Sequence, residues 1–218
     1  MNLTLNNHDI IRKQEALYEL KAARYVFRRL FQDQLFGFLS GGGMSCQLGY
    51  TSSETDQDVT HCLRLNAYEA QALIADLGLE QGYRNVVEMF SKVVSSVQPI
   101  SGPTLSGSFV GTAMQASVAK MGAFHNKLIT VGELRPILES NINDYKNKSG
   151  PAYEAGERQF GAEKFASKHW VIYLTCAIRL QIILTQFSDD ARFYFNRTAS
   201  AEATINVEWT AGFFLSTY

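Results

Sequence analysis

An aspartate and an arginine three residues apart are the strongest candidates for chemistry in this sequence. Asp189 and Arg192 lie in FSDDARFYFNR (187–197), which follows an apolar run with one charge in seventeen residues, WVIYLTCAIRLQIILTQ (170–186). Such a run predicts a largely buried helix from about residue 169 to 196. On a helix, Asp189 and Arg192 would share one face. The acid could then stabilise a developing cation while the arginine polarises or protonates a leaving group.

The same two residues have a plainer interpretation. An acid and a base spaced three apart at a helix end form an ordinary ion pair, which contributes about 0.2–0.5 kcal/mol.

Composition limits the classes of protein that this chain can belong to. It has 218 residues, 46% of them hydrophobic and 12% aromatic, which is enough for a large core without a metal or disulfide staple. The formal charge of −1 gives no global positive field that would hold nucleic acid non-specifically. Any RNA contact must therefore come from a local patch.

The cysteines and the N-terminus favour a soluble protein in a reducing compartment such as the cytoplasm. Cys46, Cys62 and Cys176 are odd in number and lack CxxC spacing, as expected for reduced structural thiols. No basic flank followed by an apolar stretch is visible at the start, so no signal peptide is predicted. The apolar stretch at Trp170 is interrupted by Arg179 after nine residues, well short of the roughly 20 that span a membrane.

The hydrophobic pattern predicts one α+β domain over residues 1–218, with a small N-terminal sheet, helices around the buried central one and a C-terminal β-hairpin. A separate N-terminal helix-and-loop module over residues 1–58 is the alternative. The expected elements are a helix from Asp9 to about Leu39, loops at SGGGMS (40–45) and TSSETDQDVT (51–60), helices at about 112–122, 132–145 and 153–168, and a hairpin of ATINVEW (203–209) with AGFFLSTY (211–218). Residues 61–79 fit a strand followed by either a helix or a second strand, and residues 80–98 mix both periods.

Metal and nucleotide motifs are weak in this chain. Gly41, Gly42 and Gly43 lack the GK[ST] ending of a phosphate loop, so they predict a flexible connection. His61 and Cys62 are adjacent and would point to opposite faces of a strand, which makes a poor zinc site. Neither a metal nor an organic cofactor is expected.

The predicted first helix carries a set of basic residues that could contact RNA phosphates. A solvated helix face is the alternative. These residues are Lys21, Arg24, Arg28 and Arg29.

The segment SDDARF (188–193) after a buried helix resembles the SEAARF-type signature of the ribosome-inactivating proteins, the plant and Shiga-type rRNA N-glycosylases. Weaker likenesses are TLSGSFVGTAMQASVAKMG (104–122), KLITVGELRPILESNINDY (127–145), LRLNAYEAQALIADL (63–77) and INVEW (205–209). The resemblance implies a toxin-like hydrolase that inhibits translation by removing an adenine from ribosomal RNA, with the ribosome as its partner and no cofactor. Arg192 would assist departure of the adenine, and Asp189 would stabilise the oxocarbenium-like sugar or orient the attacking water.

Departures from that family's pattern predict a divergent member with weakened or lost activity. Asp189 stands where the family has a glutamate and is one methylene shorter, which matters for catalytic geometry. The two tyrosines that sandwich the adenine fall on Leu73 and on Ala113 or Met114, so much of the stacking contact with the base would be lost. Trp209 would correspond to the family's cleft tryptophan.

A second hypothesis is a self-assembling structural protein, such as a helical virus coat or nucleic-acid-packaging subunit. It rests on the Arg-bearing first helix, the near-neutral charge and the aromatic segment AGFFLSTY (211–218). This hypothesis predicts a concentration-dependent polymer, whereas the N-glycosylase hypothesis predicts a monomer.

Overall fold

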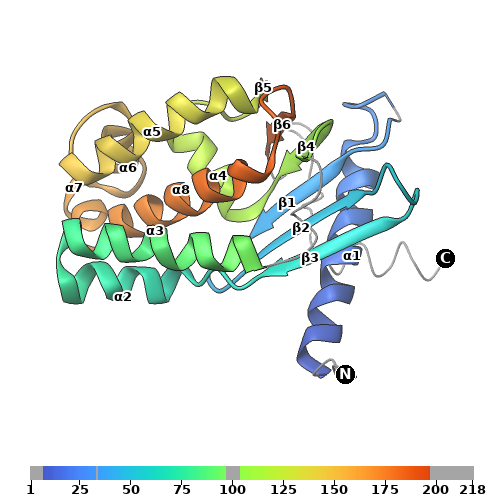
Figure 1. Cartoon of the computed structure of the whole chain (residues 1–218). Coiled ribbons are helices and arrows are strands. Elements are labelled where there is room, and N and C mark those ends of the chain that lie inside the picture. Colours follow the sequence, from blue (N-terminus) through green and yellow to red (C-terminus); the bar gives the residue numbers. More distant parts are fainter. Residues whose placement is uncertain (1–6, 33, 97–103, 197–218) are drawn as a thin grey trace.

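A six-stranded sheet in the order β3–β2–β1–β4–β6–β5 organises the computed structural model (Figure 1). The structure describes residues 7–32, 34–96 and 104–196. The strands are β1 (Gly37–Gly41), β2 (Cys46–Thr51), β3 (Asp58–Leu63), β4 (Ser108–Gly111), β5 (Leu128–Thr130) and β6 (Arg192–Phe195). The hairpins β1–β2 and β2–β3 are antiparallel, β1, β4 and β6 run parallel, and β5 is antiparallel to β6. Parallel neighbours require crossover connections, which the helices supply.

Helices cover both faces of this sheet (Figure 1). They are α1 (Asn7–Phe27), α2 (Ala67–Leu77), α3 (Leu79–Ser96), α4 (Ala113–Met121), α5 (Val131–Asn147), α6 (Pro151–Phe160), α7 (Ala162–Lys164) and α8 (Trp170–Ile183), with a π-helical turn at Phe165–His169. The helix α1 lies alone against one face, and the others lie on the opposite side. The arrangement is a mixed one of helices and strands, so the predicted α+β class holds broadly.

Alternation along the parallel strands produces two hydrophobic cores. Phe38, Val110 and Tyr194 point toward α1 and form the smaller core with its apolar side. Their neighbours Leu39 and Phe109 point to the other face and join the larger core. Successive side chains of a strand alternate between faces, so strands covered on both sides are apolar throughout.

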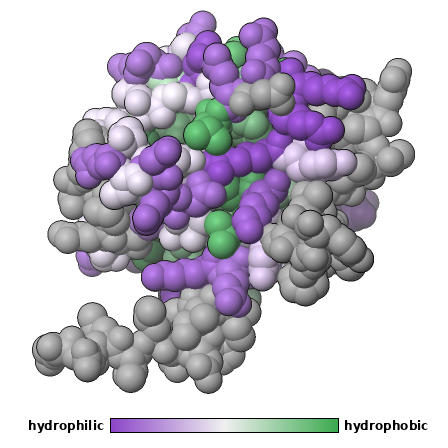
Figure 2. Space-filling view, turned by 90° about the vertical axis from the view of Figure 1, so that its right-hand side faces the viewer, coloured by the Kyte–Doolittle hydropathy of each residue, from purple (hydrophilic) through white to green (hydrophobic). Residues whose placement is uncertain are grey.

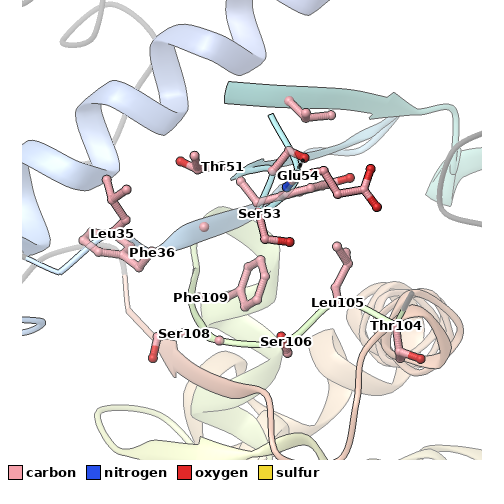
Figure 3. A pocket seen from close by; sticks show the side chains of 15 residues that line it. Leu35, Phe36, Thr51, Ser53, Glu54, Thr104, Leu105, Ser106, Ser108 and Phe109 are labelled. Atoms are coloured by element: carbon pink, nitrogen blue, oxygen red, sulfur yellow. Dashed lines mark hydrogen bonds between the residues drawn. The ribbon is translucent and has the colours of Figure 1, made fainter. Parts of the chain in front are cut away.

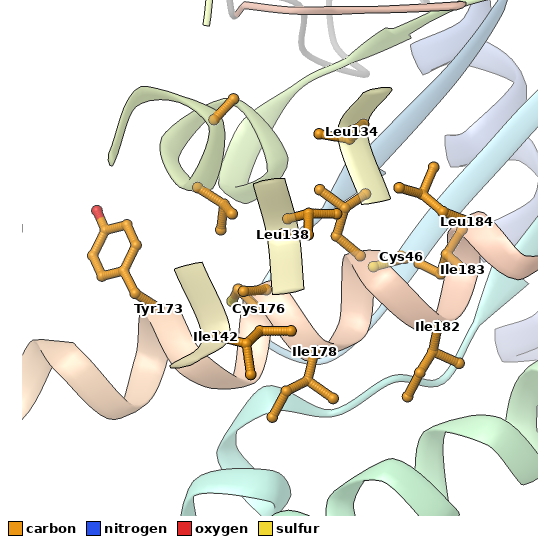
Figure 4. Packing of buried hydrophobic residues seen from close by; sticks show 14 of the residues in the cluster. Cys46, Leu134, Leu138, Ile142, Tyr173, Cys176, Ile178, Ile182, Ile183 and Leu184 are labelled. Atoms are coloured by element: carbon orange, nitrogen blue, oxygen red, sulfur yellow. The ribbon is translucent and has the colours of Figure 1, made fainter. Parts of the chain in front are cut away.

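The helix α8 runs through the larger core, as the apolar run predicts. Leu138 and Ile142 of α5 face α8 near Cys176 and Ile178 (Figure 4). Nearly every residue of α8 from Tyr173 onward is buried, including the charged Arg179. A helix that is apolar almost all round can be stable only in such a position.

Three predicted elements are corrected by the structure. The first helix ends at Phe27, and residues 37–41 form β1, where Gly37 permits an approach of Phe109 that a Cβ atom would block at 2.3 Å. The sheet is not a small N-terminal one, because its strands extend from Gly37 to Phe195. The buried helix ends at Ile183, followed by a 3-10 turn and then β6, so the region of Asp189 and Arg192 is not helical.

Other expectations are confirmed. The helices predicted near 112–122 and 132–145 are α4 and α5, and residues 61–79 hold the end of β3 followed by α2. Residues 1–58 supply α1, β1 and β2, and these two strands belong to the same sheet as β4 and β6. The single domain over residues 1–218 stays a prediction. The predicted C-terminal hairpin lies outside the described residues. In the part of the chain that the structure describes, no helix has the length and apolar character needed to cross a membrane.

Substitution by alanine should destabilise the protein at one helical glycine and have little effect at another. At Gly82 of α3, a Cβ atom would lie 2.5 Å from the Ile74 Cα atom of α2, so Gly82→Ala must push two backbones apart. We expect it to lower the free energy of unfolding by about 1–3 kcal/mol in urea denaturation. The control Gly132→Ala places its Cβ atom at an ordinary 3.4 Å from Asp189 and should change stability by less than about 1 kcal/mol. Equal effects at both positions would contradict the close α2–α3 approach.

Candidate functional site

The carboxyl ends of the parallel strands β1 and β4 meet at one edge of the sheet, where open α/β sheets bind their ligands. Beyond β1 the chain makes a turn of residues 42–45, here called the glycine turn, and returns as β2. Beyond β4 it passes through Thr112 into α4. The Thr112 N–H donates to the Leu39 carbonyl at 2.9 Å, which holds the two connections side by side.

The glycine turn presents backbone N–H groups at the surface. The Gly42 N–H donates to the Ser45 carbonyl at 3.0 Å, and Gly42 is exposed. Within the described ranges, the N–H groups of Gly43 and Met44 have no backbone acceptor. Successive unpaired N–H groups in a turn form a concavity that binds anionic oxygens.

A buried cation lies directly beneath this turn. Arg179 of α8 is fully buried, and its Nη1 atom donates to the carbonyls of Gly42 at 2.7 Å and Leu65 at 3.1 Å. Among the described residues no carboxylate pairs with it. Burial raises the pKa of the Cys46 thiol to about 11, so this neighbouring group is neutral at physiological pH. The positive charge is therefore uncompensated, and in a medium of low dielectric constant its field reaches the turn.

A carboxylate with a near-neutral pKa lies on the α1 side of the same edge. Burial and, to a smaller extent, the Glu15 carboxylate raise the pKa of Glu19 to about 7, and a hydrogen bond from the Ser40 hydroxyl opposes them. The Oε2 atom of Glu19 is shielded and has no partner among the described residues. Thr112 follows Gly111, the partner of Leu39, and so lies next to Ser40 in the sheet. Because side chains alternate along a strand, its side chain lies on the α1 face, like that of Val110. Its buried hydroxyl also lacks a partner in the part described.

The Glu19 carboxyl group has a pKa suited to acid–base chemistry near neutral pH. A carboxylate whose pKa lies near the ambient pH is suited to accept a proton from water and to release it again. The glycine turn and the N-terminus of α4 offer N–H groups to anionic oxygens. Sequence reasoning missed Glu19 because it lies within a helix assigned to packing. The spacing of Glu15 and Glu19, two like charges one turn apart, was the signal available.

The structure does not bring Asp189 and Arg192 together as a pair. Asp189 accepts a hydrogen bond from Arg135 Nη1 at 2.5 Å, and the Nη2 atom of Arg135 donates to the carbonyls of Leu184 and Phe187. Arg192 begins β6 and is exposed. The Arg135–Asp189 pair thus attaches the start of α5 to the turn that follows α8.

The predicted base-stacking residues lie on different elements. Leu73 is on α2 and is packed against the larger core, whereas Met114 is in the first turn of α4. Trp209 lies outside the described residues.

The four basic residues predicted to contact RNA lie in α1 and directly after it, and two of them have local partners. Arg24 forms an ion pair with Asp58 at 2.8 Å and also donates to Phe36, which fixes α1 on the sheet. Arg28 donates to the carbonyl of Tyr25 at 2.7 Å. Lys21 is half-buried and Arg29 is exposed. On the face drawn in Figure 2, the coloured residues are largely hydrophilic, with hydrophobic ones in small groups among them.

A cavity of about 330 Å³ opens at the opposite edge of the sheet, at the amino ends of β1 and β4 (Figure 3). Phe109, Leu105, Phe36 and Ser106 line it, and Glu54 is its single carboxylate. None of its lining side chains holds a buried polar atom without a partner. It therefore lacks the chemical features that distinguish the carboxyl edge.

Solved structures provide a comparison for this fold. A Ppx/GppA phosphatase of Aquifex aeolicus superposes with a TM-score of 0.60 at 14% identity, over 94% of this chain and 63% of that one. An exopolyphosphatase-like protein superposes with a TM-score of 0.59 at 11% identity, over 94% of this chain and 64% of that one. The chain shares the fold of these phosphatases. It spans less than two thirds of their length, and at the level of sequence no family model and no curated protein matches it.

This likeness corrects the functional expectations drawn from SDDARF. The similar structures are phosphatases and not ribosome-inactivating proteins, so the rRNA N-glycosylase activity, the translation-inhibiting toxin and the ribosomal partner are all wrong. A six-residue segment with substitutions was too short to identify a family, and the helix on which it depended ends before it. The self-assembling coat-like alternative is not supported either. As to metals, the described residues contain no group of three or more His, Cys, Asp or Glu placed to hold an ion.

The stability of the protein should fall as Glu19 ionises. Its pKa is raised from the ordinary 4.5 to about 7, so the folded state binds this proton more tightly than the unfolded state. The free energy of unfolding should therefore decrease between about pH 4.5 and pH 7, by about 1–3 kcal/mol from this group. In Glu19→Gln this decrease should be absent, and the variant should be the more stable protein at pH 8. Urea unfolding of both proteins across this range checks it. Parallel pH profiles for the two proteins would show that Glu19 does not titrate there.

Proposed function

We propose that this chain is the phosphate-binding part of a phosphatase that hydrolyses phosphoanhydride bonds, with a polyphosphate chain as its class of substrate. The observation that carries the proposal is the Glu19 carboxyl, with its pKa near 7, which is hydrogen-bonded to Ser40 at the end of β1, two residues before the glycine turn. The fold shared with proteins named phosphatase and exopolyphosphatase-like supports it.

The glycine turn would hold the phosphoryl oxygens. The free N–H groups of Gly43 and Met44 and the N-terminus of α4 donate to them, and Arg179 adds a positive field from below. A Cβ atom at Gly42 would meet no atom within 4 Å, so a phosphate can approach the backbone closely at that point.

Glu19 would act as the general base. Its carboxylate takes a proton from a water molecule while the water oxygen forms a bond to phosphorus. The bridging P–O bond breaks, and the leaving phosphate departs with the bonding electrons as an anion. Glu19 then releases its proton to solvent, which a pKa near 7 allows at neutral pH.

Binding is the first test, because the chain spans less than two thirds of the phosphatases that it resembles. We expect tripolyphosphate to bind the wild-type protein in isothermal titration calorimetry. Gly42→Ala should keep the melting temperature, since its methyl group enters open space, but lower the affinity at least about tenfold by blocking the approach to the turn. Ser53→Ala, in an exposed loop at the opposite edge, is the control. Absent binding at millimolar tripolyphosphate, or equal affinity in Gly42→Ala, would overturn the proposal.

Hydrolysis tests the role of Glu19. We expect Glu19→Gln to bind tripolyphosphate normally but to release phosphate with a kcat about 10²–10⁴-fold lower, because the base is lost. The wild-type rate should rise with pH along an acid limb centred near pH 7. Glu88→Gln, on the exposed side of α3, serves as the matched control and should retain both the rate and the profile. A Glu19→Gln enzyme as fast as wild type would assign the base to another residue.

A further inference from the structure

A cavity of about 560 Å³ lies among α4, α6 and α8, on the face of the sheet opposite α1. This volume is in the range of small-molecule sites. Its floor and walls include apolar side chains of Met114, Phe160 and Ile172. Its polar lining consists of Ser117, Lys120, His125, Gln159, His169 and Asn196. We call it the α4–α8 cavity.

The charge of the α4–α8 cavity is of one sign. No Asp or Glu is among its lining residues, and Lys120 has no ion-pair partner in the described part of the chain. Burial lowers the pKa of His125, and the positive charge of Lys120 lowers it further. A positive group facing a partly buried imidazole, with no acid nearby, is an arrangement that a bound anion would relieve.

One polar atom of the cavity wall lacks a partner. The Nε2 atom of His169 is shielded from solvent and makes no hydrogen bond among the described residues. Its ring stacks on Phe160 with centroids 4.4 Å apart and planes at 16°, which fixes its orientation. The Tyr173 ring, which also lines the cavity, belongs to the buried larger core and lies 5.9 Å from the Phe160 ring, centroid to centroid (Figure 4). Buried polar atoms are nearly always paired, so an unpaired nitrogen on a residue that lines a cavity points to a ligand that this residue reaches by a small turn of its side chain.

We propose that the α4–α8 cavity binds a small organic phosphate of about the size of a nucleoside monophosphate. Lys120, His125 and His169 contact the phosphate, and the apolar wall of Met114, Phe160 and Ile172 receives the planar part of the molecule. The site is separate from the glycine turn, since none of residues 42–45 lines it. It requires no chemical step, and its ligand is retained or released unchanged.

Binding of AMP to the full chain tests this site. We expect a dissociation constant below about 1 mM in isothermal titration calorimetry, with at least tenfold weaker binding of adenosine and of inorganic phosphate. Adenosine lacks the phosphate and inorganic phosphate lacks the planar group, so each control measures the affinity that one part of AMP contributes. In NMR, AMP should raise the pKa of His125 by placing a negative charge beside it. AMP should leave the pKa of His61 on β3 unchanged. His61 is a matched control, because burial and Lys13 lower its pKa in the same way.

Two variants locate the binding. Lys120→Met and His169→Phe should each weaken AMP binding at least about tenfold, and both should fold normally, because Lys120 is exposed and phenylalanine keeps the stack on Phe160. Lys92→Met on α3 is the matched control for a lost surface charge.

Absence of AMP binding at 10 mM, which is roughly ten times the expected limit, would overturn the proposal. So would AMP affinity that is unchanged in both Lys120→Met and His169→Phe. AMP binding that is lost in Gly42→Ala but kept in Lys120→Met would place the nucleotide on the glycine turn. That result would reject the α4–α8 cavity and leave the phosphatase proposal standing.

Discussion

The hydrogen bonds of Arg179 to the carbonyls of Gly42 and Leu65 connect three distant parts of the chain. They join the middle of α8 to the glycine turn and to the loop between β3 and α2. A Cβ atom at Gly41 would lie 2.8 Å from the guanidinium group, so the strand end rests directly on it. Breaking this contact would leave a buried charge and two carbonyls without partners, each a large penalty in a dry interior. The turn is thereby held rigid, which an oxyanion site needs in order to act without reorganisation.

Much of the fold was predictable because it depends on local patterns. The apolar run after residue 169 required a buried helix, and α8 lies at the centre of the larger core. The helices α4 and α5 followed from their spacing, and α5 has a capping box at Thr130 and Glu133. The end of the first helix was missed, because residues 28–39 keep an apolar spacing that fits a helix. A strand there becomes favourable only when β4 and the β2 hairpin pair with it, and those contacts are distant in sequence.

The candidate site was beyond the reach of local reasoning for the same reason. Ser40 and Thr112 are neighbours only because β1 pairs with β4, and Glu19 reaches Ser40 only because α1 crosses the sheet. The sequence displayed the glycines 41–43 but could not show that they end a parallel strand above a buried arginine. Asp189 and Arg192 were expected on one face of a helix because of their spacing. The helix α8 ends before them at Ile183, so this spacing does not bring them together.

The order of pairing in the sheet also constrains how the chain can fold. The β1–β2 and β2–β3 hairpins and the α2–α3 pair involve residues close in sequence and can form early. The strand β4 pairs with β6, which is synthesised some 80 residues later, as the pairing of Phe109 with Phe193 shows. Contacts of such long separation form slowly, because the loop between them must close first. During synthesis, therefore, one side of β4, with Phe109 and Val110, stays without its final neighbour until α8 has been completed. We therefore expect the protein to be most prone to aggregation while the ribosome synthesises the residues between β4 and β6. A chaperone would be most useful at that stage.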